Sequence, residues 1–262
     1  MRIAAITIAT GAGDGFALEQ TAPYGAGMAN DGPPDVGAAA GIGLLTGLSP
    51  TVLRDVVAIA RTRALPMGMR IFDQGEHAGR AHALLSGCVR ISQAGSDGEE
   101  ILVRFITPGE IFGCVPILTD GLYPADATAM IDSQEISWDP ADLVALMQRH
   151  PDIAINMIAV IGKRLGEAQE RLREVATQSV DRRIARTLLR LLDQAGSATD
   201  AGIRIGFPLR RKDIADIAGT TLHTASRILS GWQRGGLLIS RNQALTITAP
   251  DDLRRIAEDG GG

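Results

Sequence analysis

The sequence predicts an α+β protein in which an N-terminal β domain is joined by one long helix to a C-terminal winged helix-turn-helix. Three patterns in the 262 residues lead to this prediction. Short apolar runs between turn residues fill 64–139, a seven-residue apolar repeat runs through 152–179, and two helices separated by a glycine follow at 211–233. The predicted divisions are an N-terminal extension at 1–41, the β domain at 42–150, the long helix at 151–180 and the winged helix-turn-helix at 181–262.

Composition excludes several classes of protein. With 45% apolar and 21% charged residues the chain is globular rather than disordered, and no apolar window is long enough to span a membrane. The two cysteines, Cys88 and Cys114, lack CxxC partners, which argues against disulfide scaffolds and zinc ribbons. Met1–Ile6 is similar to the start of a secretion signal, but it leads into no clean cleavage site. We therefore expect a cytoplasmic protein that has no membrane partner.

Charge is distributed unevenly along the chain. The residues from Asp181 onward carry a net charge of +4, whereas the first 180 carry −8. Because phosphate is attracted by positive charge, any contact with nucleic acid is expected in the C-terminal third.

Ordered structure is expected to begin near Leu44, since residues 1–41 are nearly half glycine and alanine and have no sustained period. Ser49 followed by Pro50 is typical of a helix start, with serine as the N-cap. In the β region, Val89 and Ile91 alternate with Arg90 and Ser92, which indicates one buried and one wet face. The spacing of the turn residues predicts a compact β-barrel or sandwich.

A heptad seam predicts that the long helix pairs with a second helix over about 30 Å. The alternative is that this helix packs only on its own β domain. Gly162 and Gly166 lower helix propensity but allow close approach. The seam residues are Ile158, Ile161, Leu165, Ala168, Leu172 and Val175.

The C-terminal third begins with an amphipathic helix at 182–192 and a linker at 194–202. A first helix is then predicted at about Arg211–Ala218, Gly219 supplies the turn, and Thr221 caps a second helix that ends near Gln233. Small residues allow the helices to cross, and apolar ones, including Leu222, hold them together. Residues 235–247 are typical of a two-stranded wing. This pattern indicates a helix-turn-helix.

The start of the second helix in such a motif enters the major groove of DNA. We expect His223, Ser226 and Arg227 to contact base edges, with Arg227 donating two hydrogen bonds to guanine. Phosphate contacts are expected from Arg211, Lys212, Thr220, Thr221, Thr224 and Arg241.

From about Leu44 the chain resembles bacterial transcription regulators of the cyclic-AMP receptor protein and fumarate-nitrate regulator (Crp/Fnr) family. The resemblance rests on Leu85–Val89, on Pro108–Gly113, on the long helix and on Thr224–Leu229. It implies that the β domain is an effector-sensing β-roll, of the double-stranded β-helix or jelly-roll kind. It also implies a homodimer on a palindromic site, double-stranded DNA as partner, and RNA polymerase as a further one.

Departures from the family pattern concern the effector. Cyclic-nucleotide binders carry an acidic residue after the Phe-Gly turn and then an Arg-Ser pair, where this chain has Cys114 and Pro124-Ala125. A phosphate without its guanidinium loses its main charge-assisted bonds, so cAMP is not expected. The expected effector pocket comprises Gly113, Cys114, Tyr123, Pro124 and Ala125.

Two cysteines do not suffice for an iron-sulfur cluster. Residues 123–125 and 221–227 look like the branch of the family that responds to nitric oxide or related nitrogen oxides, which implies haem as a candidate cofactor and control of denitrification or respiration genes. Candidate haem ligands are His77, His82, Cys114 and His150, among which the sequence selects none.

His223 replaces the family's commoner glutamate. Our hypothesis is a half-site with a TTG core read through Ser226 and Arg227, and an altered preference at the outer base pair. The competing class, an enzyme, lacks support, because no Ser-His-Asp order, HExxH, GxGxxG or P-loop pattern occurs. We therefore predict no catalytic residue.

Overall fold

The computed structural model describes residues 36–95, 98–119 and 121–258. Most of the predicted N-terminal extension lies outside these ranges. Its last residues do not fit the prediction, because Val36–Ala40 form a short helix, α1, in which Ala39 is fully buried. Packing of this alanine and of Ile42 into the core moves the start of ordered structure ahead of Leu44.

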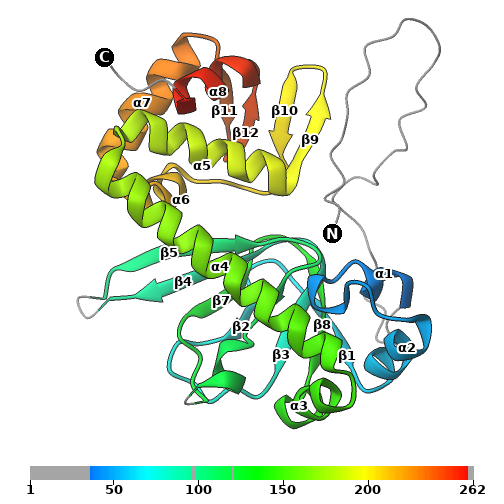
Figure 1. The fold of residues 1–262 in the computed structure, drawn as a ribbon. Helices are drawn as coiled ribbons and strands as arrows, with labels where there is room; N and C mark the ends of the chain where they lie inside the picture. Colours follow the sequence, from blue (N-terminus) through cyan, green and yellow to red (C-terminus); the bar gives the residue numbers. More distant parts are fainter. Residues whose placement is uncertain (1–35, 96–97, 120, 259–262) are drawn as a thin grey trace, which may run out of the picture.

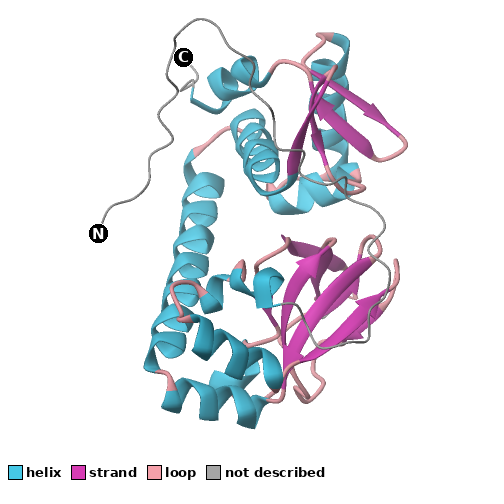
Figure 2. Ribbon diagram, turned by 90° about the vertical axis from the view of Figure 1, so that its right-hand side faces the viewer, coloured by secondary structure: helices cyan, strands magenta, loops and turns pink. Residues whose placement is uncertain are grey.

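The β domain consists of two four-stranded antiparallel sheets, which confirms the predicted fold class (Figure 2). One sheet has the order β1-β8-β3-β6 and the other β2-β7-β4-β5. Apolar side chains fill the space between them. The strands are β1 (Arg61–Leu65), β2 (Arg70–Phe72), β3 (Ala81–Ser86), β4 (Val89–Ala94), β5 (Glu100–Ile106), β6 (Ile111–Phe112), β7 (Asp126–Ala129) and β8 (Ser133–Trp138).

Short helices pack at one end of this β-roll, around the buried Trp138. The Ser49 hydroxyl accepts a hydrogen bond from Val52 N at 3.4 Å, which confirms the predicted N-cap of α2. The indole of Trp138 donates to the carbonyl of Val56 at 3.0 Å, so that α2 is tied to β8. These elements are η1 (Gly43–Leu45), α2 (Pro50–Ala58), η2 (Val115–Leu118) and α3 (Pro140–Arg149).

The long helix α4 (Pro151–Thr177) runs along the β-roll and leads into the C-terminal domain (Figure 1). Glu174 near its end is buried, and its carboxylate binds Arg190 of α5 (Val180–Ala195) at 2.8 Å and 3.1 Å. Charge-assisted bonds of this kind are strong and fix direction. This pair therefore links the end of α4 to α5.

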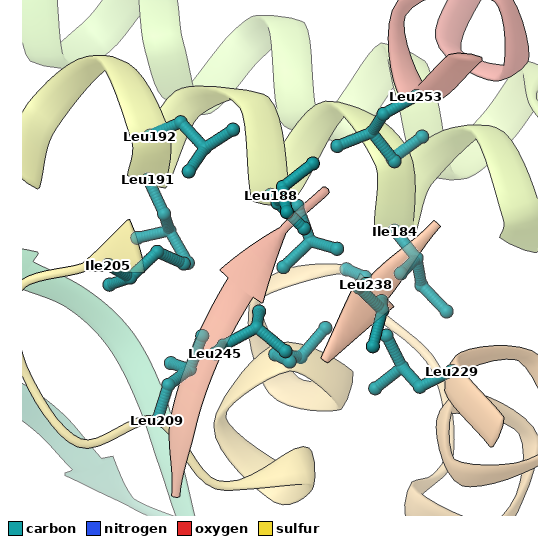
Figure 3. Packing of buried hydrophobic residues seen from close by; sticks show 14 of the residues in the cluster. Ile184, Leu188, Leu191, Leu192, Ile205, Leu209, Leu229, Leu238, Leu245 and Leu253 are labelled. Carbon is teal, nitrogen blue, oxygen red and sulfur yellow. The ribbon is translucent and has the colours of Figure 1, made fainter. Parts of the chain in front are cut away.

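The C-terminal domain packs helices on a four-stranded sheet of order β11-β12-β10-β9. Figure 3 shows its core beneath α5, where Ile184, Leu188 and Leu191 point toward the sheet. The linker predicted at 194–202 is instead occupied mainly by β9 and the start of β10. These strands form because Ile203 pairs with Ile247, which adds them to the sheet of the wing. The remaining elements are β9 (Gly196–Thr199), β10 (Gly202–Ile205), α6 (Arg211–Ile217), α7 (Leu222–Arg234), β11 (Leu238–Arg241), β12 (Ala244–Ile247) and α8 (Pro250–Glu258).

The two domains share an interface between the β4–β5 hairpin and α6. Phe105 contacts Phe207 at 4.5 Å between ring centroids, and the Asp216 carboxylate accepts from Leu102 N at 3.1 Å. Arg90 and Ser92 are buried on this side of the β-roll, contrary to the prediction of a wet face. The prediction was wrong because both side chains bind the Glu100 carboxylate, and Arg90 also lies 3.8 Å from the Asp213 carboxylate of α6.

Among the residues that the structure describes, no helix has the length and apolar character needed to cross a membrane.

Candidate DNA-binding surface and effector pocket

The helix-turn-helix is formed by α6, a turn and α7. Gly219 has φ = +61°, a conformation that side chains other than glycine rarely adopt. The Thr221 hydroxyl accepts from Thr224 N at 3.2 Å, which confirms the predicted N-cap of α7. The turn thus has the residues that its backbone requires.

Arg183 of α5 holds this turn in place, a role that the sequence analysis missed. Its guanidinium donates to the carbonyls of Ala218 at 2.8 Å, Gly219 at 3.1 Å and Gln178 at 2.8 Å. Three backbone acceptors from the ends of α6 and α4 therefore converge on one buried cation. In the sequence Arg183 is one of several arginines in an amphipathic helix, and this pattern does not indicate which groups it binds.

The exposed face of α7 carries two of the three residues predicted to read bases. His223 and Arg227 are both exposed and stand one helical turn apart, so they lie on the same face. Ser226 is half-buried beside them, while Ala225 is buried against α6. Leu222 is 49% exposed, so it does not hold the helices together as predicted; it lies at the first turn of α7, outside the crossing.

The residues predicted to contact phosphate do not all have free side chains. Arg211 donates to the Ser226 carbonyl at 3.0 Å and to the Ser230 hydroxyl at 2.7 Å, which braces α7 from α6. Lys212 lies 3.0 Å from the Asp216 carboxylate and 3.5 Å from that of Glu99 in the hairpin. The others lie at the turn, in the first turn of α7 or at the end of β11: Thr220, Thr221, Thr224 and Arg241.

Most of the heptad seam of α4 faces away from the rest of the chain. Ile158 is 70% exposed, Leu172 72% and Leu165 59%, whereas Val175, at 48%, lies beside Gly219 of the turn. Ala168 is also exposed, whereas Ile161 is half-buried against the β-roll. Apart from Ile161, the seam is therefore not used for packing on the chain's own β domain.

The expected effector pocket is divided between two places in the β-roll. Tyr123 points into the roll, where its ring stacks on Phe72 with centroids 3.8 Å apart and its hydroxyl donates to the Arg80 carbonyl at 2.8 Å. A Cβ atom on Gly113 would come within 3.2 Å of the Tyr123 ring and 2.9 Å of His82. The roll is thus tightly filled by aromatic side chains at this point. Ala125 is buried, and Pro124 is exposed.

Cys114 faces α4 instead. Arg164 of α4 places its Nη1 atom 3.8 Å from the Cys114 sulfur, and its Nη2 atom donates to the Ile111 carbonyl. Burial lowers the pKa of Arg164, as does the charge of Arg104 nearby. Nothing in the sequence distinguishes Arg164 from the other charged residues that lie outside the seam.

The four candidate haem ligands belong to separate elements. His77 is exposed, and His150 lies between α3 and α4 with its Nε2 atom 3.9 Å from the Asp55 carboxylate. His82 of β3 is buried, and its two ring nitrogens lie 2.9 Å from the Glu135 carboxylate and 3.4 Å from the Tyr123 hydroxyl. Because both nitrogens are engaged, His82 does not present a free axial ligand. The residues of the roll therefore do not fit haem ligation.

Both thiols are expected to be unreactive in the folded protein. Burial raises the pKa of Cys114, and raises that of Cys88 still further. Since the thiolate is the reactive form, a disulfide reagent such as dithionitrobenzoate should label neither cysteine rapidly at pH 8, and both after denaturation. Val115→Cys, which places a thiol at an exposed position one residue along, is the control and should react at once. Rapid labelling of Cys114 would contradict its burial against Arg164.

Both parts of the chain match known families. Residues 62–150 match the cyclic nucleotide-binding domain, and residues 182–256 match the Crp-like helix-turn-helix domain. The cyclic AMP receptor protein of Thermus thermophilus is 31% identical over 195 residues, which cover 74% of this chain and 87% of that protein. A CRP-like cAMP-activated global transcriptional regulator of Mycobacterium tuberculosis is 24% identical over 215 residues, 82% of this chain and 96% of that protein.

The fold is also that of FixK2 from Bradyrhizobium japonicum, whose solved structure aligns with a TM-score of 0.66 at 23% identity, over 78% of this chain and 100% of that one. A winged helix-turn-helix joined by a long helix to a domain of the cyclic nucleotide-binding type defines a class of DNA-binding transcription regulators. The chain belongs to the Crp/Fnr family of these regulators.

Proposed function

We propose that this regulator is a homodimer that binds a two-fold symmetric DNA site and responds to an effector other than cAMP. The observation that carries the DNA-binding part is the free face of α7, on which His223 and Arg227 stand together at the start of the recognition helix. The exposed seam of α4 supports the dimer, because Ile158, Leu165 and Leu172 are apolar and uncovered. RNA polymerase as a further partner and a cytoplasmic location are part of the same proposal.

The chemistry of the β-roll supports an effector other than cAMP. Pro124 and Ala125 offer no charge to a cyclic phosphate, and the space beside Gly113 is occupied by Tyr123 and His82. The relatives described as cAMP-dependent are 31% and 24% identical, so their ligand is not assigned to this chain. Calorimetric titration of the purified protein with cAMP should therefore show no binding, and saturable binding would contradict the proposal.

Replacing Arg227 by alanine tests the assignment of base recognition. The bidentate contact of one arginine with guanine contributes about 1–3 kcal/mol, so Arg227→Ala should weaken binding to the cognate duplex about 5- to 150-fold and leave binding to random DNA nearly unchanged. Fluorescence anisotropy at fixed salt measures both affinities. Arg234→Ala, an exposed change at the other end of α7, is the matched control. Equal losses on both duplexes would show that Arg227 contacts phosphate.

Binding experiments with the unsubstituted protein test the half-site hypothesis. Binding selection from random duplexes should return half-sites with a TTG core whose centres are about 34 Å apart, one helical turn. Selected sites without that guanine would contradict the roles of Ser226 and Arg227.

Sensing of nitrogen oxides through haem remains the alternative suggested by residues 123–125. It receives no support from the site, since His82 is fully hydrogen-bonded and the Cys114 thiol is held protonated by burial. A Soret band in anaerobically purified protein that shifts with nitric oxide would favour this alternative.

A further inference from the structure

A groove lies between β5, α4 and α5, outside the β-roll pocket described above. It encloses about 490 Å³ and takes its walls from both domains. Phe105 of β5, Leu191 of α5 and Ile217 of α6 supply an apolar surface. Concave sites with apolar walls and a few polar groups are those that bind small molecules.

Arg171 of α4 is a half-buried cation in the wall of the groove. Its Nη1 atom donates to the Val103 carbonyl at 2.9 Å and its Nε atom to the Glu167 carbonyl at 3.4 Å, but it forms no salt bridge with a described residue. Burial lowers its pKa, and the charges of Arg190 and Arg104 lower it further. A guanidinium has five N–H donors, so donors remain for an anion.

The acidic side chains around the groove are mostly bound by other cations. Glu167 lies 3.9 Å from Lys163, and Glu170 is bound by Arg173 and Arg186. Asp193 stands exposed at the end of α5. Arg171 therefore forms no ion pair with a described residue, although the charges of Glu167 and Glu174 act to raise its pKa.

Gly166 is the second, independent observation. A glycine inside a helix costs about 1 kcal/mol relative to alanine, yet a Cβ atom on Gly166 would meet nothing within 4 Å. Packing within the chain thus does not require glycine here. The residue directly follows Leu165 of the seam, at a heptad position turned away from a partner helix, so close approach of a second copy does not require it either.

We propose that this groove binds a small organic anion that has an apolar part, with Arg171 bound to its carboxylate, sulfonate or phosphate and with Gly166 leaving room for it. The occupant touches elements of both the sensor and the DNA-binding domain, so its binding favours the arrangement that holds them together. The α4 residues that line the groove do not belong to the seam, so we expect the groove to stay open in the proposed dimer. This site is independent of the proposed DNA sequence and of the effector in the β-roll.

The full-length protein should be titrated with 8-anilinonaphthalene-1-sulfonate, an anion of this class whose fluorescence rises at apolar sites. We expect saturable binding that phenyl phosphate displaces and that benzyl alcohol, which is uncharged, does not. Gly166→Leu fills the groove and should abolish this binding, whereas Gly162→Leu, the same change one turn earlier and outside the groove, should leave it intact.

Arg171→Gln removes the charge and should weaken binding about tenfold, whereas Arg254→Gln on α8 should not. Circular dichroism of each variant establishes that it folds. Binding that survives both Gly166→Leu and Arg171→Gln would place the dye elsewhere and overturn the proposal, as would displacement by benzyl alcohol. DNA affinity, measured in parallel without any probe, tests the proposed function separately.

Discussion

Replacing Leu165 and Leu172 together by glutamate should dissociate the dimer and lower the affinity for a two-fold symmetric DNA site about a thousandfold. Both side chains are exposed in the single chain, at 59% and 72%, and burial of each leucine against a partner contributes about 1.5–3 kcal/mol. Glutamate at these positions loses the free energy of burying leucine and places like charges opposite each other across the seam. A monomer then binds one half-site and loses the avidity of two linked recognition helices, which is worth about 10²- to 10⁴-fold.

Sedimentation at micromolar concentration gives the oligomeric state of this variant, and anisotropy gives its affinity for the full site and for a single half-site. Half-site binding should change little, because α7 lies in the other domain. Lys163→Glu serves as the control, since Lys163 also lies on α4 but opposite the seam, 80% exposed at its side chain. A double variant that stayed dimeric would show that copies of the chain do not associate through α4.

Arg183→Ala should lower the local stability of the helix-turn-helix by at least about 3 kcal/mol. The substitution leaves the carbonyls of Ala218, Gly219 and Gln178 without their donor in a buried position, and each hydrogen bond to a charged group contributes about 1.5–3 kcal/mol. The turn between α6 and α7 should therefore open more often, although α7 itself keeps its cap. Amide hydrogen exchange across 211–234 measures this opening directly.

Arg182→Ala is the matched control for this prediction. Arg182 precedes Arg183 on the same helix and also donates to carbonyls, those of Ala257 and Glu258, but at 3.4 Å and 3.3 Å and from a half-buried position. Its loss should cost less than about 1 kcal/mol. Equal exchange in the two variants would mean that Arg183 does not hold the turn.

Local and periodic features were available from the sequence. Ser49 and Thr221 cap helices because a hydroxyl at that position satisfies a backbone N–H whatever lies around it. Gly219 is required by the backbone of one turn, and the exposed stripe through Leu165 and Leu172 follows from spacing along a single helix. Each depends on residues within about two helical turns, so a linear pattern suffices to predict it.

Contacts between distant segments were decided only by the tertiary structure. The stretch at 194–202 has the composition of a linker, but β9 and β10 form because Ile203 finds a partner in Ile247. Arg90 and Ser92 alternate with apolar residues as a wet face should, but both are buried. They bind Glu100, and Arg90 also lies 3.8 Å from Asp213, more than a hundred residues later. The composition does not distinguish Arg183, Arg164 and Arg171 from the other arginines among the 24 in the chain. Folding places Arg183 beside backbone carbonyls, Arg164 beside a sulfur atom and Arg171 in a groove. The spacing of residues along the chain does not predict these surroundings.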